Sequence, residues 1–432
     1  MRRRPSAMTS EVLVLRHCVR STTTDVGDAG DASDFTDLAL PAWGVPPKWC
    51  TAQGLDIVER TGARLPGLLG AALAAEAPLR VVADPVLRDA DSALALLRGL
   101  GREREAVWYD ALLFDTLDPE VGEPLCSAAY TDAELAAAVR AGVAAVPPPM
   151  PLREAEALLT RLVGVGRAGP LGELPPPAVD AGGHLTGSAA VLRRLGQTIF
   201  YAFATGAAYP LHTNFSAAEL YALLGWQHYY RAVKARTAKY ATANAALLEA
   251  VLRDLAAPAP RTAIYVGHDG NLDGLAALLD LRWEAPPYLG GELLPTPPGS
   301  GLRFSASGGE VRVSFVYPVY ADAGTPPVRN ASGRLEESAI VSLSAEALGD
   351  RARLGLRSFA GAEPCFDLAA ARAAAPLLDL RGRAAPLEVA AAFAGALVVV
   401  ALLASVWFCW LRRLRRPASA AMRANRAIEL RD

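Results

Sequence analysis

The chain has 432 residues, of which 52% are hydrophobic, and its 43 basic and 45 acidic residues leave a formal net charge of -2 at pH 7. This length is enough to bury a large core and to form two domains. The balanced charge gives no global basic field, so we expect no nucleic-acid partner.

The first predicted strand leads directly into a cluster of basic residues. Residues 12–15 form a short apolar run, and Arg16, His17 and Arg20 follow where the strand should end. Ligands of open α/β sheets usually bind at the C-terminal ends of strands. Two guanidinium groups can bind phosphate oxygens, and their charge lowers the pKa of the histidine between them. The pattern therefore indicates a neutral imidazole that can attack a phosphoryl group, although this motif alone could also be a chance cluster in a turn.

The next elements continue the α/β pattern. Thr51 should cap a helix that runs to about Arg60. Residues 79–83 are typical of a second buried strand, and Arg88 follows at loop distance, where it can reach the same sheet edge. Residues 92–100 are apolar at helical spacing and should belong to the core.

From about residue 131 the pattern becomes helical. Thr131 and Glu134 form a capping-box pattern before an alanine-rich helix, which Pro147 should end. A connection rich in glycine and proline follows, and three amphipathic helices are predicted at residues 188–204, 216–235 and 238–255. We expect this segment to be a helical insertion that covers the site.

A second strand-end site follows the helical segment. Residues 262–266 form an apolar strand, and Gly267, His268 and Asp269 come directly after it, with Asn271 opening a periodic helix. A second histidine at a strand end, in a chain with five histidines, argues against a chance cluster. Strands at residues 302–305 and 311–317, joined by a Gly-Gly turn, then return the chain to the sheet.

These two motifs resemble those of the histidine acid phosphatases, branch two of the histidine phosphatase superfamily, which includes phytases and lysosomal acid phosphatases. The family pattern Arg-His-Gly-x-Arg-x-Pro reads Arg16-His17-Cys18-Val19-Arg20-Ser21-Thr22 here, and its His-Asp motif reads His268-Asp269. Cys18 and Thr22 thus replace the family's glycine and proline. Further similarities are Thr51-Ala52-Gln53-Gly54, Ala83-Asp84 followed by Arg88, Leu185-Thr186-Gly187 and Thr296-Pro297-Pro298-Gly299. The resemblance runs from about Val12 to about Leu380.

The resemblance implies a fold and a set of site residues. The fold would be an α/β phosphoglycerate-mutase-like open sheet domain, formed by residues 1–130 and 257–386, with a helical insertion domain at residues 131–256. His17 would attack phosphorus and form a phosphohistidine, and Asp269 would protonate the leaving alcohol. The phosphate oxygens would be bound by Arg16, Arg20, Arg88 and His268, and Thr23 is a further candidate for substrate contact. The resemblance implies a small phosphorylated substrate, an acidic pH optimum and no metal or cofactor.

Two alternatives remain open at this point. The replacements at Cys18 and Thr22 could have disabled the site, which would leave a protein that binds phosphorylated ligands without hydrolysing them. The chain could instead be a phosphoglycerate-mutase-like phosphoryl transferase, although the helical insertion argues against that class. The oligomeric state is not predicted.

The segment from Val389 to Leu411 is uncharged and long enough to span a bilayer. Arginines follow it at once in a basic tail, residues 412–432, which predicts that this end is cytoplasmic. We therefore expect a transmembrane helix at residues 387–411 and a single-pass membrane protein with a luminal or extracellular catalytic domain. Residues 1–5 form a short basic tip, but no apolar h-region of a signal peptide lies between it and the Arg16-His17 site, so a cleavable signal peptide is not visible. A tail-anchored protein with a cytosolic domain is the alternative.

Overall fold

The computed structural model describes residues 9–27, 30–73, 78–110, 113–114, 131–235, 237–257, 259, 261–288, 291–320 and 334–359. All of them belong to the first of two units into which the chain divides, Met1–Asp379. The predicted membrane segment, Val389 to Leu411, and the basic tail lie outside the described residues. Within the described ranges, no helix has the length and apolar character that crossing a bilayer requires.

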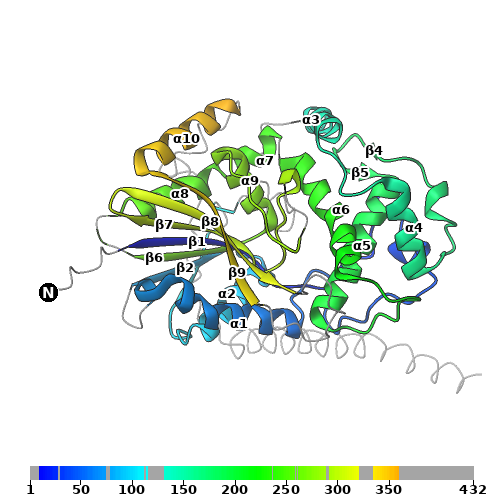
Figure 1. Cartoon of the computed structure of the whole chain (residues 1–432), viewed down its shortest axis with the longest axis horizontal. Coiled ribbons are helices and arrows are strands. Elements are labelled where there is room, and N and C mark those ends of the chain that lie inside the picture. The colour runs from blue at the N-terminus through cyan, green and yellow to red at the C-terminus, as the bar shows by residue number, and fades with distance from the viewer. Residues whose placement is uncertain are drawn as a thin grey trace, which may run out of the picture. The chain divides into compact units, whose positions relative to one another are not determined.

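A seven-stranded mixed sheet forms the centre of this unit (Figure 1). Its strand order is β3-β2-β6-β1-β7-β8-β9, with four parallel neighbours at one side and antiparallel strands at the other. This confirms the predicted α/β class, and the sheet is mixed. The strands are β1 (Ser10–Arg16), β2 (Leu79–Ala83), β3 (Val107–Tyr109), β6 (Thr262–Gly267), β7 (Gly301–Ser307), β8 (Glu310–Val319) and β9 (Arg334–Ser344).

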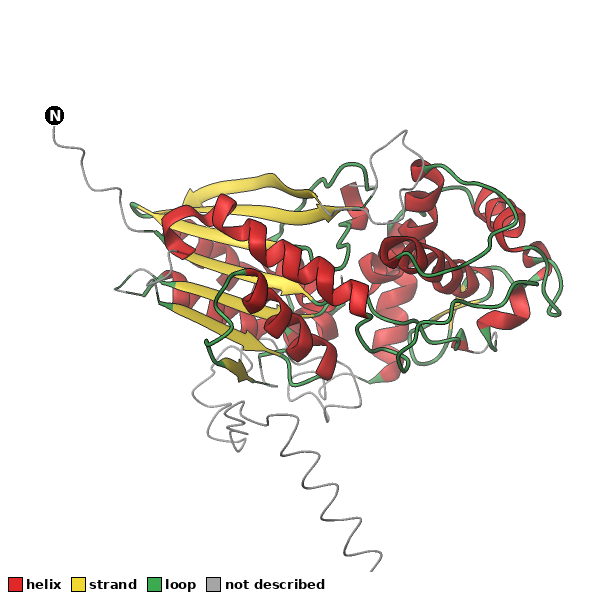
Figure 2. Cartoon of the chain, turned by 90° about the horizontal axis from the view of Figure 1, so that it is seen from below, coloured by secondary structure: helices red, strands yellow, loops and turns green. Residues whose placement is uncertain are grey.

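Helices cover both faces of the sheet, as Figure 2 shows. Alternate residues of β1 point to opposite faces, because side chains in a strand have a period of two. Leu13 and Leu15 pack in the cluster that α1 (Ala52–Leu69) and α2 (Leu87–Gly99) complete. Val12 and Val14 pack in the cluster that contains α8 (Ala245–Leu255), α9 (Asp269–Leu279) and α10 (Ala345–Ser358). The strand is therefore buried on both sides, as its continuous apolar run predicts.

The prediction that the first helix ends near Arg60 is wrong, since α1 continues to Leu69. Gly62 lies in its middle, and a Cβ atom there would come within 2.3 Å of the backbone oxygen of Leu96 on α2. A Cβ on Gly99 of α2 would come within 1.8 Å of the Glu59 oxygen. The two glycines thus let the helices approach closely, and this packing outweighs the weak helix propensity of the segment.

The segment between residues 131 and 256 is largely helical. The predicted capping box is confirmed, since Thr131 Oγ1 accepts from the Glu134 N–H and the Glu134 carboxylate accepts from the Thr131 N–H. The predicted helix over residues 238–255 is interrupted at Asn244, whose side-chain amide donates to the carbonyls of Tyr240 and Gly270. The elements are α3 (Asp132–Ala145), α4 (Leu152–Val163), β4 (Ala178–Val179), β5 (Leu185–Thr186), α5 (Ser188–Thr205), α6 (Ala217–Ala235), α7 (Ala238–Ala243) and α8.

Short 3-10 turns connect several of these elements, at η2 (Ala32–Phe35), η3 (Gly70–Leu73), η5 (Leu171–Glu173) and η6 (Gly291–Leu293). The expected division into a discontinuous catalytic domain and an insertion stays a prediction.

The helices α5, α6 and α7 lie at the end of the sheet where β1 and β6 finish, so they border the predicted site (Figure 1).

Candidate active site

Three neighbouring parallel strands bring the predicted site residues to one edge of the sheet. The strands β1, β6 and β2 run side by side, so their C-terminal ends meet. His17 follows β1, His268 follows β6, and Arg88 lies in the first turn of α2, shortly after β2. The His17 N–H donates to the Gly267 carbonyl at 2.9 Å, and the rings of His17 and His268 lie 5.4 Å apart, centroid to centroid.

The hydrogen bonding of His17 suits a nucleophile. Its Nδ1 lies 2.8 Å from the Cys18 carbonyl oxygen, which can only accept, so Nδ1 carries the proton and Nε2 keeps a free lone pair. The pKa of His17 lies well below its ordinary value, first because the ring is buried. Electrostatic interaction with the neighbouring basic side chains lowers it further, and these are Arg88, His268, Arg16 and Arg20. The predicted direction is confirmed, and burial is the larger cause.

Arg16 is buried and contacts groups from α5, from α9 and from the loop before β7. Its Nη2 donates to the hydroxyl of Tyr201 on α5 at 2.8 Å and lies 3.0 Å from Asp269 Oδ2, and its Nη1 donates to the Thr296 carbonyl. Arg20 is half-buried and donates to the carbonyl of Ser21 at 2.9 Å. Both guanidinium groups contribute to the lowered pKa of His17, so this ring lies in a positive field.

His268 joins Arg88 to a buried carboxylate. Its Nε2 lies 3.0 Å from Asp84 Oδ2, and its Nδ1 lies 3.3 Å from Arg88 Nη2. A carboxylate accepts and a guanidinium donates, so Nε2 donates to Asp84 while Nδ1 accepts from Arg88. The His268 N–H donates to Asn271 Oδ1 at 2.7 Å, which fixes the start of α9 and its positive N-terminal end at the site.

Two arginines hold Asp269. Arg16 Nη2 lies 3.0 Å from its Oδ2, and Arg231 Nε on α6 lies 3.6 Å from the same oxygen. Arg231 also makes a two-point ion pair with the buried Asp273, one turn further along α9. Burial alone would raise the pKa of Asp269, but Arg16 and Arg231, assisted by His17 and His268, hold it well below its ordinary value. The acid predicted to protonate the leaving group is thus ionised when no substrate is present.

Asp89 is a further carboxyl group at this edge. It belongs to the first turn of α2 and is fully buried. One of its oxygens and one ring nitrogen each of His17 and His268 all lie within 4.8 Å of one another. Such a set could hold a metal ion, and the sequence does not reveal it because its members come from three separate segments. The guanidinium groups of Arg16, Arg20 and Arg88 around it favour an anion instead.

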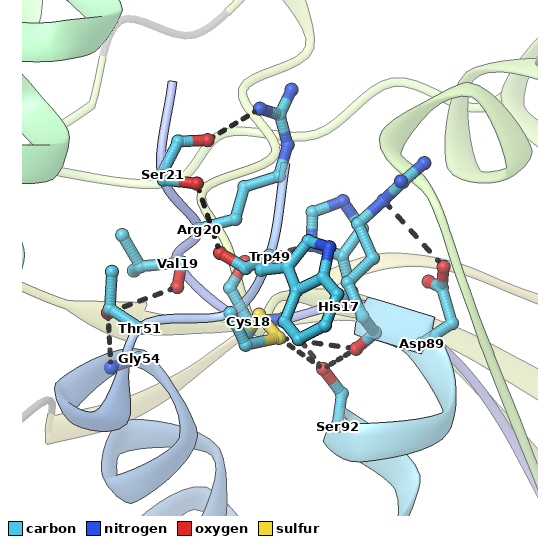
Figure 3. The surroundings of a disulfide bond; sticks show 12 residues. His17, Cys18, Val19, Arg20, Ser21, Trp49, Thr51, Gly54, Asp89 and Ser92 are labelled. Carbon is cyan, nitrogen blue, oxygen red and sulfur yellow. Dashed lines mark hydrogen bonds and ion pairs between the residues drawn. A yellow bond between two sulfur atoms is a disulfide. The ribbon is translucent and has the colours of Figure 1, made fainter. Parts of the chain in front are cut away.

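A disulfide between Cys18 and Cys50 fixes the loop that follows His17 (Figure 3), with 5.8 Å between the Cα atoms. Cys18 N–H donates to Ser92 Oγ at 2.9 Å, and Ser92 Oγ donates to the Arg88 carbonyl at 2.6 Å, so the loop is also tied to α2. The next residue, Thr51, caps α1. Cysteine at position 18 in place of the family's glycine is therefore part of a covalent link, a pairing that the cysteine count did not predict.

The structure brings together most of the residues that the sequence predicted. Five of them lie at one sheet edge: Arg16, His17, Arg88, His268 and Asp269. Arg20 is half-buried and interacts electrostatically with His17. Thr23 is half-buried in the following loop, and the described contacts do not join it to this group. The catalytic and binding roles themselves stay predictions.

Sequence reasoning missed several residues of the site. Thr296 and Gly299, identified only as a motif, contact Arg16 and His17 through their backbone. His228 is fully buried, with its Nδ1 3.1 Å from Arg231 Nη1. Asp84 is likewise identified only as part of a motif. The other missed residues are Tyr201, Arg231, Asp273 and Asp89. Only Asp273 carries a signal in the sequence, because it lies four residues after Asp269 on one helix face.

No family model matches the sequence, and no curated protein matches it either. Among solved structures, the chain is similar to the phytase of Hafnia alvei, with a TM-score of 0.65 and 17% identity, covering 84% of this chain and 99% of that one. It is similar to the phytase of Citrobacter braakii, with a TM-score of 0.62, 20% identity and coverage of 81% and 98%. It is also similar to the phytase of Klebsiella sp. ASR1, with a TM-score of 0.61, 20% identity and coverage of 80% and 96%. These neighbours belong to the histidine acid phosphatases that the two motifs resemble, and at this identity the match shows that the chain has their fold.

Proposed function

We propose that this protein hydrolyses phosphate monoesters through a phosphohistidine intermediate on His17. The observation that carries the proposal is the state of this side chain. Its Nδ1–H donates to the Cys18 carbonyl, so Nε2 is the unprotonated nitrogen. The pKa of the ring is lowered, first by burial and then by the surrounding cations, so Nε2 stays unprotonated and nucleophilic even in acid. Arginines at the same sheet edge supply the donors that a phosphoryl group needs.

The first step forms a bond between His17 Nε2 and phosphorus while the bond to the leaving oxygen breaks. Arg16, Arg20 and Arg88 bind the phosphoryl oxygens and stabilise their charge. The predicted role of His268 in the same binding requires its ring to leave the contact with Asp84 or Arg88 that it makes in the free site. Asp269 gives its proton to the leaving oxygen, so that an alcohol departs instead of an alkoxide. In the second step water attacks phosphorus, Asp269 takes up a proton from it, and the bond to His17 breaks to release phosphate.

Asp269 is ionised in the free site, so it must take up a proton when the substrate binds. In the free site Arg16 and Arg231 hold the pKa of Asp269 low, against the opposing effect of burial. A phosphate dianion that binds Arg16 removes part of this stabilisation and adds negative charge nearby, which raises the pKa of Asp269. Substrate binding and proton uptake are thus coupled, and activity is favoured by acid.

We further propose that Val389 to Leu411 anchors the protein in a membrane, with the catalytic unit on the luminal or extracellular side. The Cys18–Cys50 disulfide supports this side, because structural disulfides persist in oxidising compartments. Alkylation of free thiols in intact cells, followed by reduction and a second alkylation, tests it. A disulfide that is oxidised in cells supports the luminal side, whereas two free thiols would favour the cytosolic, tail-anchored arrangement.

The catalytic proposal is tested with the full chain in detergent, by phosphate release from an aryl phosphate between about pH 3 and pH 8 in the presence of a chelator. We expect activity below neutral pH and a loss of at least about a thousandfold in His17→Ala. His184→Ala is the matched control, since His184 is exposed and paired with Asp180. Acid quenching with labelled substrate should trap phosphohistidine in the wild type only.

The experiment also separates the alternatives. A folded wild type that binds inorganic phosphate but releases none from the ester would favour the ligand-binding protein. Activity that the chelator abolishes would contradict the metal-free scheme. Transfer of the phosphoryl group to a second alcohol in place of water would favour the mutase-like transferase.

A further inference from the structure

Asp89 is the carboxyl group that the proposed mechanism leaves without a task. It is fully buried at the start of α2, on the same side of the loop as His17 (Figure 3), and His268 lies beside it. Its position is fixed, because Ser92 of the same helix binds both the Cys18 N–H and the Arg88 carbonyl. A phosphoryl oxygen within hydrogen-bond reach of His17 and His268 is therefore also close to Asp89.

The surroundings of Asp89 do not provide the donors that a carboxylate needs. Its Oδ2 lies 3.4 Å from His268 Nε2 and 3.8 Å from Arg88 Nε. The proton on His268 Nε2 is directed to Asp84 Oδ2, at the shorter distance of 3.0 Å. Within the described part of the chain, neither oxygen of Asp89 accepts a hydrogen bond. A buried carboxylate without hydrogen bonds is costly, and a proton removes that cost.

The charges around Asp89 act in both directions. Burial raises its pKa to about 7, the carboxylates of Asp84 and Asp269 act in the same direction, and His268 and Arg88 oppose them. The groups that face Asp89 come from α2 itself, from the ends of β1, β2 and β6, and from the start of α9: Arg88, His17, Asp84, His268 and Asp269. A bound phosphate dianion would add further negative charge beside it.

We propose that Asp89 is a substrate-binding residue that acts as the neutral acid, its hydroxyl donating a hydrogen bond to a phosphoryl oxygen between His17 and His268. The carboxylate form repels the dianion, so the site accepts a doubly charged tetrahedral anion when Asp89 is protonated and releases it when Asp89 ionises. This inference rests on the proposed function in one respect, that the anion bound here is the phosphoryl group of the substrate.

A metal ion is the other species that could satisfy Asp89 together with the two histidines. The three guanidinium groups at this edge oppose a cation there, and binding it would occupy the nucleophile. A proton satisfies the same carboxyl group without adding a second positive ion, so we assign the proton.

Sulfate is the probe that tests the proposal, because it is tetrahedral and carries two negative charges throughout the range from about pH 6 to pH 9. Its binding to the full chain is measured by calorimetry, which does not depend on turnover. For the wild type we expect the affinity to fall about tenfold for each pH unit above about 7, the dependence that a single proton produces. For Asp89→Asn, which keeps a donor and cannot ionise, we expect the affinity to stay constant within about threefold.

Two further variants keep the result interpretable. Asp89→Ala lacks the donor, so it should bind sulfate about tenfold more weakly than Asp89→Asn and also without pH dependence. Asp91→Asn, on the same helix, should behave as the wild type. A slope in Asp89→Asn equal to that of the wild type, or no binding by folded Asp89→Asn at about pH 6, would overturn the proposal. The expected sulfate binding in a chain that hydrolyses no ester would instead refute the proposed function and leave the role of Asp89 standing.

A metal ion gives a separate signature in the same experiment. If zinc, added alone, bound tightly and Asp89→Asn lost that binding, Asp89 would be a metal ligand and the assignment of the proton would be wrong. Absence of zinc binding at concentrations where sulfate binds supports the proton.

Discussion

Replacing Asp89 by asparagine should change how the stability of the protein depends on pH. Burial raises the pKa of Asp89 from 3.8 to about 7, so the folded state holds this proton more tightly than the unfolded chain does. Between these two values the folded state binds more protons, and stability falls as the pH rises. Each pKa unit corresponds to about 1.4 kcal/mol, so the wild type loses at most about 4 kcal/mol across this window and nothing further above it. Asparagine does not titrate and removes this loss.

The assay is urea unfolding of the wild type and Asp89→Asn at about pH 4 and about pH 8. At each pH we take the difference in the free energy of unfolding between the two proteins, and then compare the two differences. The contributions of the other titrating groups cancel, because both proteins share them. We expect Asp89→Asn to gain up to about 4 kcal/mol relative to the wild type between the two pH values. Asp56→Asn, at an exposed position on α1, is the control and should gain less than about 1 kcal/mol. An equal difference at both pH values would mean that folded Asp89 is ionised throughout, and the argument from burial would be refuted.

Three other predictions concern the loop and the acid. Replacing Cys18 and Cys50 by alanine should lower the free energy of unfolding by about 4 kcal/mol, from the loop-length relation for a separation of 32 residues, and should make chemical unfolding insensitive to reductant. Gly54→Ala should destabilise the fold by about 1–3 kcal/mol and lower activity, because its Cβ would lie 2.0 Å from the backbone oxygen of Val19 in the loop after His17. Gly67→Ala on the same helix is the control. Its Cβ would meet nothing within 4 Å, so it should be tolerated in the same unfolding and activity assays. Sulfate binding at about pH 4.5 should take up close to one proton, measured by calorimetry in buffers of different ionisation enthalpy, and Asp269→Asn should abolish this uptake. An Asp269→Asn variant that still takes up the proton would assign it to another group.

The sequence predicts the parts of the fold that depend on local patterns. The apolar run of β1 followed by charges, the Gly-Gly turn between β7 and β8, and the capping box of α3 all follow from side-chain period and turn chemistry. The length of α1 does not, because it depends on contacts between Gly62 and α2 that have no local signal. The break at Asn244 likewise arises from hydrogen bonds to Gly270 and Asn271, far along the chain.

The site divides in the same way. Arg16, His17 and His268 stand directly at strand ends, where topology alone places them together. Arg231 reaches Asp269 from α6, a helix whose inward face the sequence does not specify. Cys18 and Cys50 are separated by a long loop, and an uneven set of five cysteines leaves their pairing open. In the sequence Asp89 is one more acidic residue in a helix, and only the packing of α2 against the loop after His17 places it at the site.

Asp89 and Asp269 have pKa values shifted in opposite directions, which separates their proposed tasks. Burial raises the pKa of Asp89, which lacks hydrogen-bond donors, whereas paired arginines overcome burial at Asp269 and lower its pKa. Such divergence within one site commonly marks groups with different proton roles. Acid would then favour the reaction twice, once by keeping Asp89 neutral for anion binding and once by supplying the proton for the leaving group. Asp89→Asn should therefore flatten the pH dependence of KM above about pH 6 while kcat still falls toward alkaline pH, and a parallel change in both would show that the two groups act as one.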